Sequence, residues 1–551
     1  MTEESLKPAS YKRIILCSDG TWLSSDMGDK AIPSNVAKLA RAVATTGLDA
    51  GGNLVKQVVS YHPGLGSGDL PFQKAISGGF IKLQSCLALC LPRNSFTDML
   101  AFLFTGGIGL GLDSDVAQIY DFVSNNYEPG DELFFFGFSR GAFTVRSVAS
   151  IVCDVGVLSA EHMSRFPDMW KAYRANTSGE PFSKSSWYRD NKDELGLNKT
   201  TVKVVGVWDT VGALGIPEWP LVGWLTTAGV PINKQYAFHN TTLSKYVDYA
   251  FQALAIDEKR ITFPPTLWHK TSEGPAKDLQ QCWFPGVHGN IGGQAEDPRA
   301  NGDFEEIGDN TFAWMVDNLS GMLTFEEAAI KILTEEHRRA LNAINITNGW
   351  GCGPIVDNFS GLQGTFFRLL GKKDRTPGNY PRDPGDGIGG ATNEYFHPIA
   401  RIRKSKRSDY NPASLLGYSR EEPDGSAGWR WVKAGVQDVP EYVMRPEKTM
   451  SLAYKEGGKV KFRVDESLSR LLCPSNILVD LDRDNGIAVV ENGVSATPKV
   501  AVSLDTARYP AIAHQKLTFI YSAQQQYHRR TLTAYTSEKR DDRIMPHHYL
   551  G

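Results

Sequence analysis

Short, almost wholly apolar segments alternate with longer helix-compatible segments through the first two thirds of the chain. Each short segment ends at a turn or a polar residue, as buried strands do, and they span 13–18, 54–61, 132–137, 202–208 and 281–284. Strands without polar alternation are typical of a parallel sheet that is covered on both faces. The pattern therefore predicts an α/β fold, a parallel sheet with helices on both faces, over residues 10–345.

Two regions depart from this alternation. Residues 67–111 insert an apolar segment at 80–91, whose length favours a core helix pair, with a lid or lipid-facing surface as the alternative. After residue 345, glycine, proline and aspartate cluster. A basic run at 401–407 then predicts an edge strand or a solvated surface, and 459–464 alternates as a strand does. We interpret 346–551 as an accessory region with β-structure.

A Gly-x-Ser-x-Gly motif directly follows the apolar strand 132–137. Gly137, Ser139 and Gly141 form it, and a helix-compatible run begins at Ala142. A serine on a sharp strand-to-helix turn needs small residues two positions to either side, and these glycines meet that need. This setting predicts an α/β-hydrolase-like fold with Ser139 as nucleophile.

The same turn supplies part of an oxyanion hole. The backbone N–H of Arg140 lies at the start of the following helix, where it can donate to a developing negative charge. The second donor of such sites comes from the loop after an earlier strand, which here contains Gly20 and Thr21. We therefore predict that Gly20, Thr21 and Arg140 form the oxyanion hole.

A serine nucleophile needs a histidine base and an acid that orients it, in the chain order serine, acid, histidine. His288 follows the strand 281–284 in a glycine-rich loop, which makes it the candidate base. Asp209 ends the strand 202–208 and is the preferred acid, while Asp257 is the alternative.

Composition limits the other possibilities. A net charge of −3 gives no reason to expect nucleic acid as a partner. The seven cysteines form no Cys-x-x-Cys pair, residues 1–13 lack the apolar run of a signal peptide, and no segment is apolar enough to span a bilayer. We therefore expect a cytoplasmic protein without a disulfide framework.

One acidic segment imitates a calcium loop. Asp480, Asp482 and Asp484 take the first, third and fifth places, but the glycine falls one place late. A β-hairpin that turns at Asn485–Gly486 explains the pattern better. No metal or cofactor is therefore expected.

Several motifs occur together in a characteristic order. They are Asp19-Gly20-Thr21-Trp22, Gly137-Phe138-Ser139-Arg140-Gly141-Ala142-Phe143, Val207-Trp208-Asp209-Thr210-Val211-Gly212, Ala253-Leu254-Ala255-Ile256-Asp257-Glu258-Lys259-Arg260 and Trp283-Phe284-Pro285-Gly286-Val287-His288. Over residues 10–320 this set resembles the catalytic domain of the type VI secretion phospholipase effectors, part of a wider bacterial and fungal family.

The resemblance implies a hydrolase that cleaves lipid esters through Ser139, Asp209 and His288. Its substrate would be a lipid or small ester, with peripheral membrane contact. The segment after His288 departs from the family pattern, because members commonly have Ser-Asp and then three glycines, whereas this chain has Gly289-Asn290 and then Gly292-Gly293-Gln294. A non-catalytic scaffold, a general esterase and an acyltransferase remain the alternatives.

Overall fold

The computed structural model describes the chain in separate segments. These are residues 6–20, 32–64, 109–176, 180–211, 242–270, 278–293, 305–344, 346–347, 349–360, 367–368, 371–380, 391–422, 428–487, 490–491 and 494–495. Thr21 lies outside them, as does the insertion expected at 67–111, except for its last three residues, which begin helix α4 (Gly109–Asn126). Contacts divide the chain into two units, residues 1–481 and 482–551.

An eight-stranded sheet forms the centre of the first unit. In order across the sheet, its strands are β2 (Thr46–Leu48), β3 (Leu54–His62), β1 (Pro8–Ser18), β4 (Glu132–Phe138), β5 (Val202–Trp208), β6 (Val247–Ala255), β7 (Asp278–Phe284) and β9 (Glu394–Phe396). All neighbouring pairs are parallel except β2 with β3. The predicted parallel sheet is confirmed.

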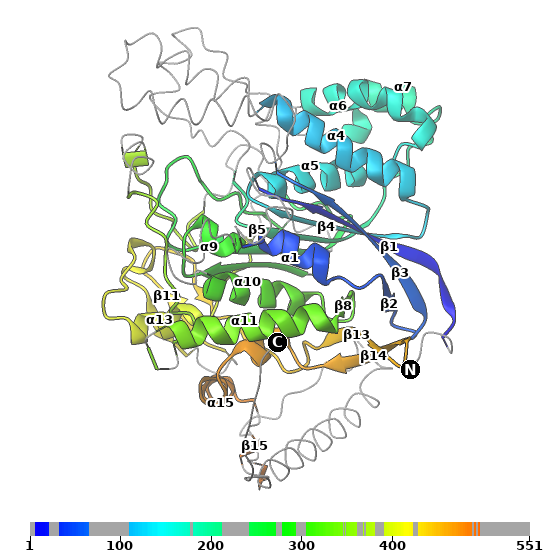
Figure 1. The fold of residues 1–551 in the computed structure, drawn as a ribbon. Helices are drawn as coiled ribbons and strands as arrows, with labels where there is room; N and C mark the ends of the chain where they lie inside the picture. The colour runs from blue at the N-terminus through cyan, green and yellow to red at the C-terminus, as the bar shows by residue number, and fades with distance from the viewer. Residues whose placement is uncertain are drawn as a thin grey trace, which may run out of the picture. The chain divides into compact units, whose positions relative to one another are not determined.

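Helices cover both faces of this sheet (Figure 1). The side chains of Ile14 and Leu16 on β1 pack with α4, α5 (Arg140–Asp154) and α6 (Phe166–Ala175). Their neighbours Ile15 and Cys17 pack on the opposite face with α1 (Asn35–Ala42), α10 (Glu305–Asn318) and α11 (Glu327–Ala343). Successive side chains of a strand point to opposite faces, so the uninterrupted apolar run of β1 serves two cores at once.

The region after residue 345 adds β-structure, as predicted. It contributes β9 to the central sheet, the strands of a small sheet β10-β11-β12, and two strands of another, β14-β13-β8.

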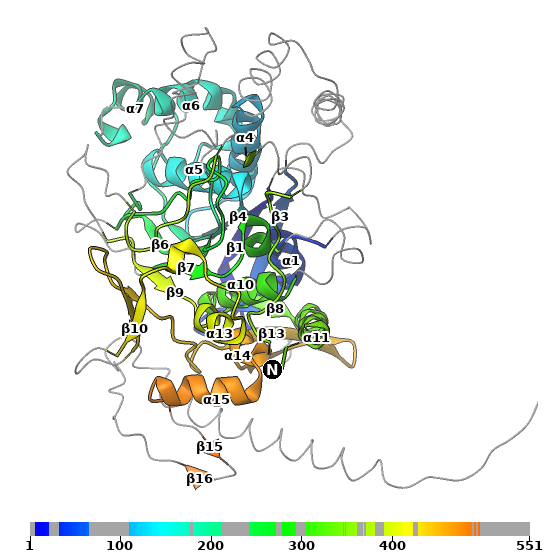
Figure 2. The ribbon, with the colours of Figure 1, turned by 90° about the vertical axis from the view of Figure 1, so that its left-hand side faces the viewer.

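The other helices and strands of the described segments, before and after residue 345, have the following bounds. They are α7 (Ser186–Asn191), α9 (His288–Gly292), α13 (Ile399–Lys406), α14 (Leu468–Leu472), α15 (Ser475–Asp484), the 3-10 helices Ala160–Arg165, Phe182–Lys184 and Ala413–Leu415, and the strands β8 (Thr324–Glu326), β10 (Ser419–Glu421), β11 (Arg430–Val432), β12 (Val439–Pro440), β13 (Met450–Glu456), β14 (Lys459–Asp465), β15 (Val490–Glu491) and β16 (Val494–Ser495). Figure 2 shows α13 and α14 on the same side of the central sheet as α10.

Three local predictions in this region have different outcomes. The strand predicted at 459–464 is confirmed as β14. The edge strand predicted at 401–407 is wrong, because these residues form most of α13, whose buried Arg403 donates to the carbonyls of Gly351 and Gly353. The hairpin predicted to turn at Asn485–Gly486 is also wrong, because the preceding acidic segment is the end of helix α15.

Both edges of the central sheet continue into other segments through backbone hydrogen bonds. At one edge, the Tyr442 N–H donates to the Phe396 carbonyl of β9 over 2.8 Å. At the other, Ala44 N–H, just before β2, donates to the Thr324 carbonyl of β8 over 3.0 Å. The accessory β-structure therefore extends the central sheet rather than standing apart from it.

Candidate active site

Ser139 occupies a strained turn between β4 and α5. Its φ of 57° and ψ of −120° are unusual for a residue with a side chain. A Cβ at Gly137 would lie 2.6 Å from the Ala142 nitrogen, and one at Gly141 would lie 2.1 Å from the Ser18 carbonyl. Both glycines are therefore required for the turn to pack against the end of β1. The Ser139 hydroxyl has no hydrogen-bond partner among the described residues.

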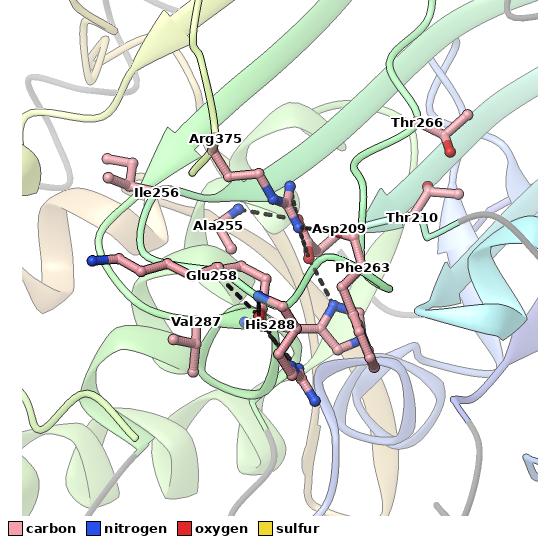
Figure 3. Close-up of polar contacts among 12 residues, drawn as sticks. Asp209, Thr210, Ala255, Ile256, Glu258, Phe263, Thr266, Val287, His288 and Arg375 are labelled. Atoms are coloured by element: carbon pink, nitrogen blue, oxygen red, sulfur yellow. Dashed lines mark hydrogen bonds and ion pairs between the residues drawn. The ribbon is translucent and has the colours of Figure 1, made fainter. Parts of the chain in front are cut away.

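The structure brings His288 and Asp209 into direct contact. Asp209 follows β5 and is fully buried, while His288 begins α9 just after β7. The His288 Nδ1 and Asp209 Oδ2 atoms are 2.6 Å apart, and the Ala255 N–H donates to Asp209 Oδ1 over 3.1 Å. Figure 3 shows the imidazole beneath this carboxylate.

The alternative acid, Asp257, serves the local backbone instead. Its Oδ2 accepts from the Gly286 N–H at 2.6 Å and from the Tyr410 hydroxyl at 3.0 Å. Burial raises its pKa to about 6. The contacts of Asp257 hold the turn that leads into His288, and the imidazole pairs with Asp209.

Aromatic packing holds the imidazole at the same sheet edge as the strained serine. The His288 ring centroid lies 4.7 Å from that of Phe138, the residue before Ser139. Phe263 contacts the ring edge-on at 5.0 Å. Gly292 permits this arrangement, because a Cβ there would lie 2.2 Å from Phe138 Cζ. The imidazole is thus packed against the strand residue that carries the serine.

Arg375, which the sequence did not single out, completes the surroundings of Asp209. Its two terminal nitrogens donate to the two carboxylate oxygens of Asp209 over 3.2 and 3.1 Å. Burial alone would raise the pKa of Asp209, but the charge of Arg375 and the hydrogen bond from His288 bring it to about 2. Asp209 is therefore ionised, and His288 Nδ1 must be the donor in their hydrogen bond.

Glu258 is a second buried carboxylate beside the histidine. Its Oε2 accepts from the His288 backbone N–H at 3.1 Å and from Arg260 at 2.8 Å. Burial would raise the pKa of Glu258, but the charge and hydrogen bonds of Arg260, together with the charge of Arg375, lower it. This ionised side chain fixes the backbone from which the imidazole projects. In the sequence, the indication of its importance is the position of Glu258 next to Asp257 in the segment 253–260 that resembles the family.

The predicted oxyanion donors are in different situations. As the first residue of α5, Arg140 has a backbone N–H without a partner inside the helix. The Gly20 N–H donates to Asp19 Oδ1 over 2.8 Å, so it is engaged in this structure. Asp19 is itself held by the hydroxyls of Ser34 at 2.5 Å and Tyr61 at 2.8 Å. Of the two predicted donors that the structure describes, Arg140 is therefore the one whose N–H is not bonded to a carboxylate.

The described segments contain neither a metal-binding cluster nor a membrane-spanning helix. No group of three or more histidine, cysteine or acidic residues there could hold a metal ion. No helix within those segments combines the length and apolar character needed to cross a bilayer. Cys17, Cys153, Cys282, Cys352 and Cys473 are buried, and none of these five forms a disulfide bond.

Comparison with known proteins places this chain in a family. The model for the catalytic domain of Tle1-like phospholipase effectors of the type VI secretion system matches residues 12–318. The chain belongs to this family. The match includes Ser139, Asp209 and His288 but ends before β9 and Arg375, so the family domain is extended here by segments from the later part of the chain.

Relatives and solved structures with likeness to the chain cover it only in part. An uncharacterized protein of Saccharomyces cerevisiae is 26% identical over 278 residues, which are 47% of this chain and 34% of that protein. The chain therefore spans about a third of the length of this relative.

Two solved structures are also similar. An uncharacterized protein from Pseudomonas aeruginosa has a TM-score of 0.30 and 14% identity, covering 66% of this chain and 53% of that one. The Tle1 effector bound to the VgrG spike from the type VI secretion system has a TM-score of 0.25 and 17% identity, covering 52% of each chain.

Proposed function

We propose that this protein is a serine hydrolase that cleaves lipid acyl esters through Ser139, His288 and Asp209. The observation that carries the proposal is the 2.6 Å contact between His288 and Asp209, with the imidazole packed on the residue that precedes the strained serine. The three groups follow the parallel strands β4, β5 and β7, whose carboxyl ends lie at one edge of the sheet, where active sites of open α/β sheets form.

The mechanism follows from the hydrogen bonds. Because His288 Nδ1 donates to the ionised Asp209, its Nε2 carries a lone pair and can take the proton of the Ser139 hydroxyl. Ser139 Oγ then attacks the acyl carbon, and the Arg140 N–H donates to the oxyanion that forms. His288 returns the proton to the leaving alcohol, which departs as the acyl-enzyme forms. Water, activated by the same imidazole, releases the acid.

A lipid is the favoured substrate because the matched family consists of phospholipase effector domains. Such a substrate would bring the protein into peripheral contact with a membrane surface. General esterase activity and acyl transfer to another acceptor use the same three groups, so the products distinguish them. A non-catalytic scaffold is the alternative of another class.

Labelling with a fluorophosphonate probe tests the proposal. The wild-type protein should be labelled and Ser139→Ala should not, because the probe forms a covalent bond with an activated serine. Release of fatty acid from phospholipid vesicles, neutral lipid emulsions and short-chain esters should then be compared for the two proteins. Absence of wild-type labelling would support the scaffold, and cleavage of short esters alone would indicate a general esterase.

A further inference from the structure

The segment 371–380 joins the candidate site although it lies beyond the residues that match the family. The Lys373 N–H donates to the Lys259 carbonyl over 2.9 Å, and the backbones of Lys372 and Arg260 form an antiparallel β-bridge. These backbone contacts tie the segment to the loop that follows β6. They bring the Arg375 side chain, only 3% exposed, to the end of β5.

Arg375 makes a two-pronged contact with the candidate acid (Figure 3). One terminal nitrogen donates to Asp209 Oδ1, and the other donates to Asp209 Oδ2 and to the Phe263 carbonyl over 2.9 Å. Asp209 therefore accepts four hydrogen bonds, two from the guanidinium and one each from His288 and Ala255. A carboxylate offers about four acceptor sites, so its orientation is fully determined.

We propose that Arg375 is a positioning residue for the hydrolytic reaction. It fixes the Asp209 carboxylate against His288 and offsets part of its negative charge. This inference rests on the proposed function, and it assigns a role in the reaction to a residue outside the family domain.

The charge balance explains why such a residue matters. A fully buried carboxylate without a cation would be costly to ionise. The Arg375 guanidinium supplies that cation, and its two hydrogen bonds hold the carboxylate in the orientation that faces His288 Nδ1. The other charges nearby, Glu258 and Arg260, pair with each other over 2.8 Å, which leaves Arg375 as the cation bonded to Asp209.

The test compares Arg375→Met with wild type and with a control, Lys373→Met, whose exposed side chain lies in the same segment. The rate of fluorophosphonate labelling is measured over a range of probe concentrations, with circular dichroism to confirm folding. Arg375→Met should label roughly tenfold or more slowly at saturating probe, with little change in the half-saturating probe concentration, because a misoriented carboxylate impairs the imidazole and not the binding of the probe. A saturating rate equal to that of Lys373→Met would overturn the proposal.

Arg375→Lys provides a second measurement if the methionine variant does not fold. It keeps the charge but loses one of the two parallel hydrogen bonds, so the saturating labelling rate should fall several-fold below that of wild type. A wild-type rate in Arg375→Lys would contradict the positioning role. Failure of the proposed function gives a different result, because wild type and Lys373→Met would then also remain unlabelled.

Discussion

Ser139 and Asp209 both adopt positive φ, 57° and 38°, and each directly follows a strand of the central sheet. Residues with side chains rarely take this conformation, and it persists only where the surroundings hold it. At Ser139 the surroundings are the two glycines of the turn. At Asp209 they are the hydrogen bonds from Arg375, His288 and Ala255. The strain thus falls on two residues of the proposed triad.

The two candidate acids can be separated by matched substitutions. Asp209→Asn should lower kcat by about 10³-fold or more, because an amide facing Nδ1 favours the wrong imidazole tautomer. Asp257→Asn should retain most activity, because an amide oxygen can still accept from Gly286 and Tyr410. Both are measured as ester hydrolysis at pH 8. Equal losses in the two variants would contradict the assignment of Asp209.

At the scale of elements, two buried glutamines join the sheet to its neighbouring loops. The Gln252 amide donates to Gln281 Oε1 over 2.9 Å. The Gln281 amide donates to the carbonyls of Trp268 and Thr392, and its oxygen accepts from the Trp268 N–H. These contacts fasten the loop after β6 and the segment before β9 to the strand between them.

Gln281→Met should therefore be strongly destabilising, while Gln280→Met should not. Methionine at 281 leaves several buried backbone groups without partners, at a cost of about 3 kcal/mol. The side chain of Gln280 is half-buried and donates to Asp278 alone among the described residues. Urea unfolding followed by tryptophan fluorescence measures both. A midpoint for Gln281→Met as high as that for Gln280→Met would show that these bonds contribute little.

The same scale shows what sequence could predict. The strands could be predicted because their apolar runs are continuous. Ser139, Asp209 and His288 became candidate site residues because each follows such a run. Strand β6 was missed, since Asp248 and Gln252 interrupt its apolar pattern, and β9 has only three residues. Arg375 had no local signal at all, because its role depends on contacts with residues more than a hundred positions away.

At the scale of the whole molecule, the later part of the chain supplies components of the first. Residues after 345 provide β9, Arg375 and two strands of the sheet that includes β8. The unit defined by contacts accordingly runs to residue 481, well past the end of the family match at 318. A family domain cut out by sequence similarity would lack one edge strand and the cation that holds Asp209.

Truncation tests this dependence. A chain ending at residue 345 should lose fluorophosphonate labelling and unfold at a lower urea concentration, because Asp209 would be left without its guanidinium and β7 without its neighbour. A chain ending at 487 keeps the first unit and should retain both properties. Labelling of the shorter chain at the wild-type rate would show that the later segments are dispensable.

The bonds made by Phe396 and Thr324 at the two margins of the sheet have a consequence for association between molecules. Edge strands with unpaired backbone N–H and C=O groups pair with strands of other chains, which leads to fibres and domain-swapped dimers. Here the chain's own segments occupy positions at both margins. Copies of this protein that associate are thus expected to meet through side chains rather than by pairing the edge strands of their central sheets.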